Sequence, residues 1–128
     1  MDSQATDTQG GAILALFRQF DDATRRRDVE ALMAMMTDDC VFENTLPPPD
    51  GTRYDGAVAV RAAWEELFRS TREPVFETEE VFACGDRCVI RWVFSWGNSD
   101  GTRGHVRGVD VWRVRDGKVA EMLSYVKG

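Results

Sequence analysis

The 128-residue sequence predicts a single α+β domain in which three N-terminal helices pack on one face of a curved, mostly antiparallel sheet. Two observations predict this fold class. Apolar residues recur at helical spacing before Pro74, and their period changes to two after it. The composition, 43% hydrophobic and 30% charged, is that of an ordinary globular domain with enough chain to bury a core.

The helical half divides into three segments. The first helix is predicted from Gly11 to Arg27, and residues 1–10 before it are predicted to be a polar, disordered tail. Asp28 is well placed as the N-cap of a second, short helix. A third helix is predicted over residues 57–70, where apolar side chains form one stripe. The single domain therefore spans residues 11–128.

The strands begin with a short segment at residues 40–44. Residues 45–56 are predicted to be a loop, because three prolines and two glycines exclude regular structure. Four further strands with alternating apolar residues are expected at 75–83, 87–97, 104–114 and 118–126.

The pairing of the two central strands follows from the turn between them. Asp100-Gly101 is typical of a two-residue hairpin turn. That turn places Arg91 opposite Asp110 among apolar neighbours, on the face that the helices cover. Such an ion pair fits a ligand cavity with one charged spot, and a structural cross-strand salt bridge is the alternative.

The same turn assigns a second apolar face to the sheet. This face is predicted to carry Trp92, Phe94, Val109 and Val111, with His105 at its end. Helices cover only one face, and a large exposed apolar face usually marks an interface. The sequence therefore predicts a homodimer through this outer face.

Two turns are compatible with the last hairpin, a two-residue turn and a three-residue loop, both containing Gly117. The three-residue loop places Met122 and Ser124 on the face of Asp110, with Met122 opposite Asp110. We prefer this loop, because the two-residue turn would bury Glu121, which is costly.

Charge and cysteine content exclude several classes of protein. A net charge of −6 lacks the basic footprint of a nucleic-acid binder. No apolar run is long enough to span a membrane, and the acidic N-terminus is unlike a signal peptide, so we predict a cytoplasmic protein. Cys40, Cys84 and Cys88 are an odd count typical of reduced thiols, and a single histidine leaves a zinc site without ligands.

Three segments carry a family resemblance: RRDVEALMAMMTDDCVFEN, GAVAVRAAWEELF and GVDVWRVRDGKVAEM. Their order and spacing over residues 12–127 resemble the SnoaL-like branch of the nuclear-transport-factor-two-like superfamily. The resemblance implies a cystatin-like cone of curved sheet around the helices, a deep apolar pocket, and dimers joined through the outer sheet face. The superfamily mixes enzymes, binding modules and transport adaptors, so the fold alone does not define the function.

Two enzyme types of this superfamily match the sequence incompletely. In ketosteroid isomerase the general base falls on Asn44, which cannot take a proton. Its oxyanion tyrosine falls on Phe20, which cannot donate a hydrogen bond, and its second oxyanion donor falls on Asp110. Limonene epoxide hydrolase has an arginine at the position of Arg91, but both of its acids are missing here.

The resemblance to SnoaL-type polyketide cyclases keeps its principal residue. It implies that Asp110 is the acid/base group, with Arg91 as its orienting partner, and that neither metal nor cofactor is needed. The implied ligand is a small, apolar carbonyl compound, which includes polycyclic ones. A non-catalytic ligand-binding or dimerisation module of the same fold is the alternative.

Seven residues are expected to contact this ligand. For Asn44 the alternative role is to cap the proline-rich loop, and Tyr54 either gates the mouth of the pocket or covers the core. The aromatic members could equally be simple core residues. The full set is Phe17, Phe20, Asn44, Tyr54, Trp64, Trp112 and Met122.

Overall fold

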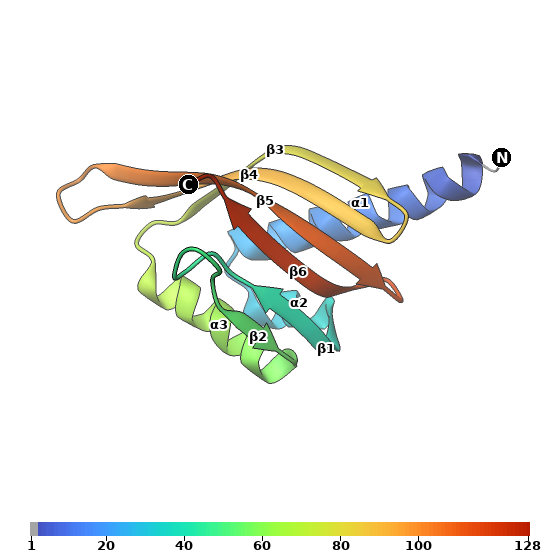
Figure 1. The fold of residues 1–128 in the computed structure, drawn as a ribbon, viewed down its shortest axis with the longest axis horizontal. Helices are drawn as coiled ribbons and strands as arrows, with labels where there is room; N and C mark the ends of the chain where they lie inside the picture. Colours follow the sequence, from blue (N-terminus) through green and yellow to red (C-terminus); the bar gives the residue numbers. More distant parts are fainter. Residues whose placement is uncertain (1–2) are drawn as a thin grey trace.

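The computed structural model describes residues 3–128, with side chains from residue 8 onward. Three helices pack on one side of a six-stranded mixed sheet (Figure 1). The strand order is β2-β1-β6-β5-β4-β3, in which β1 and β6 run parallel and the other neighbours run antiparallel. The predicted α+β class is confirmed. The elements are α1 (Ser3–Arg25), α2 (Val29–Ala34), β1 (Met36–Glu43), β2 (Arg53–Asp55), α3 (Ala57–Ser70), β3 (Val75–Cys84), β4 (Arg87–Gly97), β5 (Arg103–Arg115) and β6 (Lys118–Val126).

The helices follow the sequence pattern closely. Helix α3 has the predicted bounds, and the carboxylate of Asp28 caps α2 by accepting a hydrogen bond from the backbone N–H of Ala31 at 3.0 Å. Helix α1 begins at Ser3, inside the segment predicted as a tail, while residues 1–2 lie outside the described residues. The division of the chain into a tail and a domain stays a prediction.

Strand β2 corrects the predicted loop. It pairs antiparallel with β1, and Tyr54 lies opposite Phe42. The three prolines occupy only positions 47–49, so the backbone after Gly51 is free to donate to a neighbouring strand.

The β4–β5 turn is a three-residue loop, and the predicted two-residue turn is wrong. The backbone N–H of Asn98 donates to the carbonyl of Thr102 at 2.8 Å, which closes a loop over residues 99–101. Gly101 has a φ of 87°, whereas a two-residue turn of the predicted type needs positive φ at Asp100 as well. The Asp100 side chain instead accepts a hydrogen bond from the backbone of Thr102.

This loop shifts the register of the pair by one residue, and so it exchanges the faces of one strand. Asp110 lies opposite Ile90, and Arg91 lies opposite Val109. The predicted pairing of Arg91 with Asp110 is therefore wrong. We call the side of the sheet that carries Asp110 and packs against the helices the inner face, and the side that carries Arg91 the outer face.

The set of residues predicted for the outer face also needs correction. Val109 and Val111 lie on the outer face, since they share a face with Arg91. Trp92 and Phe94 belong instead to the inner face, because they alternate with Arg91 along β4.

The β5–β6 turn is the two-residue alternative, with positive φ at both Asp116 (53°) and Gly117 (74°). The register then shifts between Arg113 and Val114, where β6 gains one residue in a bulge. Because of this bulge, Glu121 returns to the outer face, which removes the objection to the short turn.

The bulge also decides the partners of the inner face. Ser124 lies opposite Asp110, and Met122 lies opposite Trp112. The prediction that Met122 and Ser124 share the face of Asp110 is confirmed, while the predicted pairing of Met122 with Asp110 is wrong.

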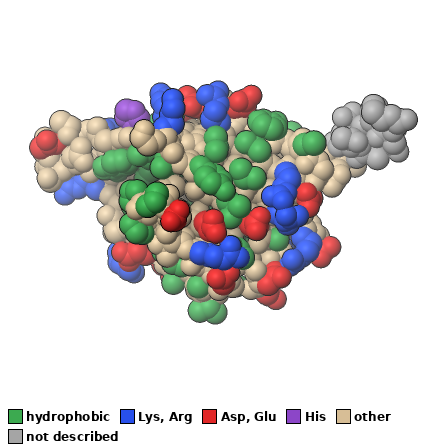
Figure 2. Space-filling view, in the orientation of Figure 1, with side chains coloured by type: hydrophobic (Ala, Val, Ile, Leu, Met, Phe, Trp, Pro, Cys, Tyr) green, Lys and Arg blue, Asp and Glu red, His purple; other side chains and the backbone are tan. Residues whose placement is uncertain are grey.

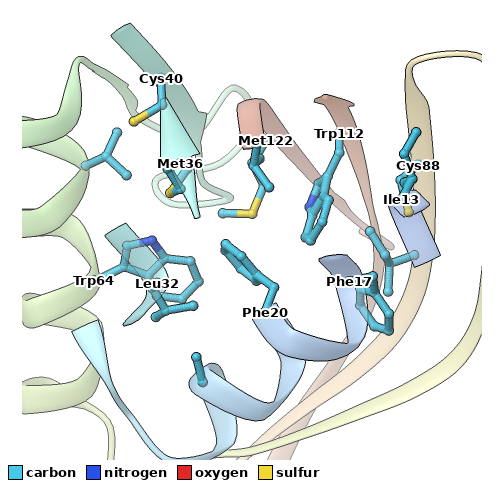
Figure 3. Packing of buried hydrophobic residues seen from close by; sticks show 14 residues of the cluster. Ile13, Phe17, Phe20, Leu32, Met36, Cys40, Trp64, Cys88, Trp112 and Met122 are labelled. Atoms are coloured by element: carbon cyan, nitrogen blue, oxygen red, sulfur yellow. The ribbon is translucent and has the colours of Figure 1, made fainter. Parts of the chain in front are cut away.

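The core lies between α1, α3 and the inner face of the sheet (Figure 3). Phe20 from α1 stands between Trp64 from α3 and Trp112 from β5, with ring centroids 5.8 and 4.8 Å away. None of the described helices is both long and apolar enough to cross a membrane.

Candidate functional site

Asp110 is a half-buried carboxylate on the inner face, held by two neutral donors. Trp92 donates its indole N–H to Oδ1 at 3.0 Å, and Ser124 donates its hydroxyl to the same oxygen at 2.6 Å. The second oxygen, Oδ2, accepts no hydrogen bond from the described residues, nor is it among their buried unpartnered atoms. Asp110 therefore has one oxygen fixed and one free.

Gly108 lets Trp92 reach Asp110. Trp92 on β4 lies opposite Gly108 on β5. A Cβ at Gly108 would lie 2.7 Å from the Trp92 ring and 2.3 Å from the Tyr125 carbonyl oxygen. Only glycine leaves the space for the indole to lie across β5. The same arrangement recurs where Trp96 lies over Gly104.

Burial raises the pKa of Asp110 to about 6, because the charged form loses its hydration. The hydrogen bonds from Ser124 and Trp92 lower the pKa and oppose this effect. None of the described charged side chains contributes to the shift. Both protonation states of Asp110 are therefore accessible near neutral pH, as acid/base catalysis requires.

Arg91 does not take part in this site. On the outer face its guanidinium lies 3.3 Å from the Glu80 carboxylate and 3.8 Å from that of Glu79. The predicted role of Arg91 as the partner of Asp110 fails for a geometric reason, because the two side chains point to opposite sides of the sheet.

The five apolar side chains predicted as pocket walls do come together, but they contact one another. All of them belong to the buried core, and Figure 3 shows their side chains packed between the helices and the sheet. A ligand therefore has to displace side chains to lie among them. They are Phe17, Phe20, Trp64, Trp112 and Met122.

Asn44 and Tyr54 have the alternative roles that the sequence allowed. Asn44 Oδ1 accepts hydrogen bonds from the backbone N–H groups of Leu46 and Thr52, and so it caps the proline-rich loop. The Tyr54 ring stacks on Phe42 at 5.9 Å and covers the edge of the core.

Asp110 lines neither of two hollows on the described surface. One, of about 180 Å³, lies between α1 and the β5–β6 turn. The other, of about 220 Å³, lies between the end of α1 and the start of β3. In the part of the chain that the structure describes, no three His, Cys, Asp or Glu side chains gather as metal ligands.

The sequence reasoning missed two residues of the site, Trp92 and Ser124. Trp92 was expected on the opposite face, and Ser124 was expected on the correct face without a role. One signal was present: a register that pairs Trp92 with Gly108 also pairs Trp96 with Gly104. Aromatic residues often cover glycines across a strand pair in this way.

Comparison with known proteins places the chain in a family. Residues 17–122 match the model of the SnoaL-like domain. No curated protein is close enough in sequence to count as a match. An NTF2-like protein of unknown function from Mesorhizobium loti has 37% sequence identity and a TM-score of 0.80, over 94% of each chain.

Two further solved structures share the fold. A candidate polyketide cyclase from Sinorhizobium meliloti is 23% identical, with a TM-score of 0.71 over 86% of this chain and 93% of that one. A protein from Mycobacterium tuberculosis, solved in complex with estradiol-17β-hemisuccinate, is 25% identical, with a TM-score of 0.73 over 89% of this chain and 92% of that one. The resemblance drawn from the sequence is confirmed.

Proposed function

Since the chain belongs to the SnoaL-like domain family, we propose that it is a cofactor-independent proton-transfer enzyme of the isomerase, cyclase or hydratase type. Its substrate is an apolar carbonyl compound, of a class that includes polycyclic ketones, bound at the inner face of the sheet. Asp110 is the acid/base group. Its free Oδ2 takes a proton from a carbon beside the carbonyl, and the protonated form returns it.

The observation that carries this proposal is the environment of the Asp110 carboxyl group. Its carboxyl lies on the inner face beside an apolar core, its pKa is raised to about 6, and one oxygen is free. A carboxylate paired with an arginine would stay ionised and would exchange protons poorly near neutral pH. The separation of Arg91 from Asp110 therefore supports proton transfer better than the predicted ion pair did.

Known relatives support the ligand class. The Mycobacterium tuberculosis protein was solved with a steroid derivative, and the Sinorhizobium meliloti protein is a candidate polyketide cyclase. A steroid consists of fused, mostly apolar rings with oxygen substituents. The apolar core residues around Phe20 would surround such rings after rearrangement.

The test is hydrogen–deuterium exchange at carbon. The protein is incubated in D₂O with 2-tetralone, a bicyclic ketone with acidic C–H groups, and deuterium uptake is followed by mass spectrometry. We expect catalysed exchange above the buffer rate, and a loss of about 10²–10⁴-fold in Asp110→Asn. The control is Arg91→Gln, which lies on the outer face and should exchange at the wild-type rate.

Equal exchange rates for wild type and Asp110→Asn would contradict the proposal. The second candidate, a non-catalytic binding or dimerisation module, is favoured by the close packing of the predicted pocket walls. It predicts that ligands such as 2-tetralone raise the melting temperature without any exchange above background.

We propose in addition a homodimer through the outer face. Its centre is half-buried and apolar, formed by Val89, Val93, Val109, Val111 and Leu123. Figure 2 shows hydrophobic side chains in the middle of this face with charged ones around them, which is the usual anatomy of an interface. Light scattering should give a dimer for the wild type and a monomer for Val109→Asp; a monomeric wild type at micromolar concentration would contradict it.

A cytoplasmic location completes the proposal. All three cysteines are unpaired, and two of them are buried. Burial raises the pKa of the Cys88 thiol to about 11. Such thiols are stable in the reducing environment of the cytoplasm.

A further inference from the structure

Two buried hydrogen-bond donors in the core have no acceptor. The indole N–H groups of Trp64 and Trp112 are unpartnered among the described residues, although the two side chains are only 5% and 2% exposed. An indole nitrogen can only donate, and leaving a buried donor unpaired costs about 1–3 kcal/mol. Because folded proteins pair nearly all such groups, each of these two donors calls for an acceptor that the protein chain itself does not supply.

Trp112 stands beside the acid/base group. It lies two residues from Asp110 on β5, so both side chains point to the inner face, and their Cα atoms are about 6.6 Å apart at ~3.3 Å per residue. In Figure 3 the Trp112 indole nitrogen is on the side of the ring that faces Met122. The inner face thus carries a free donor and a free carboxyl oxygen on residues two positions apart on one strand.

Trp64 holds the other free donor in a different place. It projects from α3, and Figure 3 shows it across the Phe20 ring from Trp112. The chemical group is the same, and the burial is similar. Trp64 therefore offers a matched comparison for a function that depends on proximity to Asp110.

We propose that the indole N–H of Trp112 binds the carbonyl oxygen of the substrate, while Asp110 Oδ2 moves the proton on the adjacent carbon. This inference rests on the proposed function and adds the group that binds the substrate oxygen. The C–H bond breaks and its electron pair forms the C=C bond of an enolate. The C=O π pair moves onto the oxygen, and the proton forms an O–H bond on Asp110. The reverse transfer to carbon completes the cycle, with no co-reactant.

The physical reason is the charge that develops in this step. When Asp110 takes the proton, negative charge moves to the substrate oxygen, and a fixed donor in a dry site stabilises that charge strongly. The flexible Met122 side chain, which pairs with Trp112 across the strands, is suited to move aside for a ligand. The donor is already desolvated, so binding an acceptor recovers the cost of its burial.

The first test is direct and needs no variant to assign a role. Protein with ¹⁵N-labelled tryptophan is titrated with 2-tetralone and, separately, with tetralin, the hydrocarbon of the same shape without the oxygen. We expect 2-tetralone to move the Trp112 indole N–H resonance downfield, while tetralin leaves it without a downfield shift. No shift of this resonance with 2-tetralone at millimolar concentration would overturn the proposal.

The second test uses matched variants. Trp112→Phe keeps an aromatic ring but removes the donor, and we expect about 3- to 10-fold weaker binding of 2-tetralone relative to tetralin. Trp64→Phe, which removes the other unpaired donor, should change the affinity for 2-tetralone and the affinity for tetralin by the same factor. An equal loss of ketone preference in both variants, or in neither, would overturn the assignment to Trp112.

Deuterium exchange separates this inference from the proposed function. For 2-tetralone, we expect Trp112→Phe to lower kcat by about 10²-fold, with a smaller change in KM. If Asp110→Asn abolishes exchange and Trp112→Phe does not slow it, the further inference fails and the proposed function stands. If Asp110→Asn exchanges like the wild type, the proposed function fails.

Discussion

Carboxylates on the two faces of the sheet have different partners. On the outer face Glu79 lies 2.8 Å from the Arg107 guanidinium, and Asp86 lies 3.3 Å from that of Arg113. On the inner face Asp110 has no cation, and its two hydrogen bonds come from the neutral donors Trp92 and Ser124. The two arginines lie on β5 together with Asp110, and they alternate with it along the strand, so that they point to the outer face.

This difference teaches where reactivity can arise in the fold. The outer acids are paired with arginines at the surface, and such surface pairs contribute little to stability. Asp110 is desolvated without a compensating charge, so its folded-state pKa moves toward neutrality. Alternation along a strand is enough to separate a stable charged surface from a proton-exchanging group.

The largest expected effect is on packing. Phe20 contacts both Trp64 and Trp112, and it is 4% exposed. We expect Phe20→Ala to lower the free energy of unfolding by about 3–5 kcal/mol. Phe82→Ala, on the outer face and 49% exposed, should cost less than about 1 kcal/mol. Urea denaturation at low protein concentration measures the unfolding free energy of both variants. Equal losses of unfolding free energy would contradict the assignment of the core to the inner face.

The next effect is a pH dependence of stability that comes from the inner face. The pKa of Asp110 is raised from an ordinary value near 3.8 to about 6 in the folded protein, so the folded state holds this proton more tightly than the unfolded chain does. The contribution to stability is complete below pH 4 and is lost as the pH rises through 6. At about 1.4 kcal/mol per pKa unit, the loss is roughly 2–3 kcal/mol.

Asp110→Asn isolates this contribution, because asparagine does not titrate. The difference in unfolding free energy between wild type and Asp110→Asn should therefore fall between pH 4 and pH 6, as measured by urea denaturation. A difference that is constant across this range would show that Asp110 has an ordinary pKa.

A smaller effect concerns the two hydrogen bonds that Asp110 Oδ1 accepts. Removal of the hydroxyl in Ser124→Ala takes away a hydrogen bond that favours the ionised form, so the pKa of Asp110 should rise, by about one. Ser124→Thr keeps a hydroxyl and should restore the wild-type value. Arg91→Gln, on the outer face, should leave the pKa unchanged, and an equal rise there would mean that charge acts across the sheet.

The three helices and the last four strands could be predicted from the sequence because they depend on local periodicity, whereas β2 and the start of β1 at Met36 were missed. The α3 stripe and the Asp28 cap are examples of such local signals. The pairing register depends instead on turn length, and the turns that join β4 to β5 and β5 to β6 both contain Asp-Gly but differ in length. Asp116-Gly117 forms a two-residue turn, whereas Asp100-Gly101 lies in a three-residue loop. The dipeptide alone does not distinguish the two.

The candidate site depends on that register, which explains which parts of it were missed. Asp110 was identified because the segment GVDVW resembles the strand that carries the acid/base aspartate of SnoaL-type cyclases. Its partners were missed because a shift of one residue moved Trp92 to the inner face and Arg91 to the outer face. The pairing of Trp92 with Gly108 and of Trp96 with Gly104 is the side-chain information that would have selected the observed register.

The most direct test of the central claim is the titration of the Asp110 carboxyl itself. Its side-chain ¹³C resonance, assigned by comparison with Asp110→Asn, is followed by NMR from pH 3 to pH 9, together with the indole N–H of Trp92. We predict that both signals titrate together with a midpoint of about 6. A carboxyl midpoint of 4 or below would mean that Asp110 stays ionised at neutral pH, and it would contradict the assignment of Asp110 as the acid/base group.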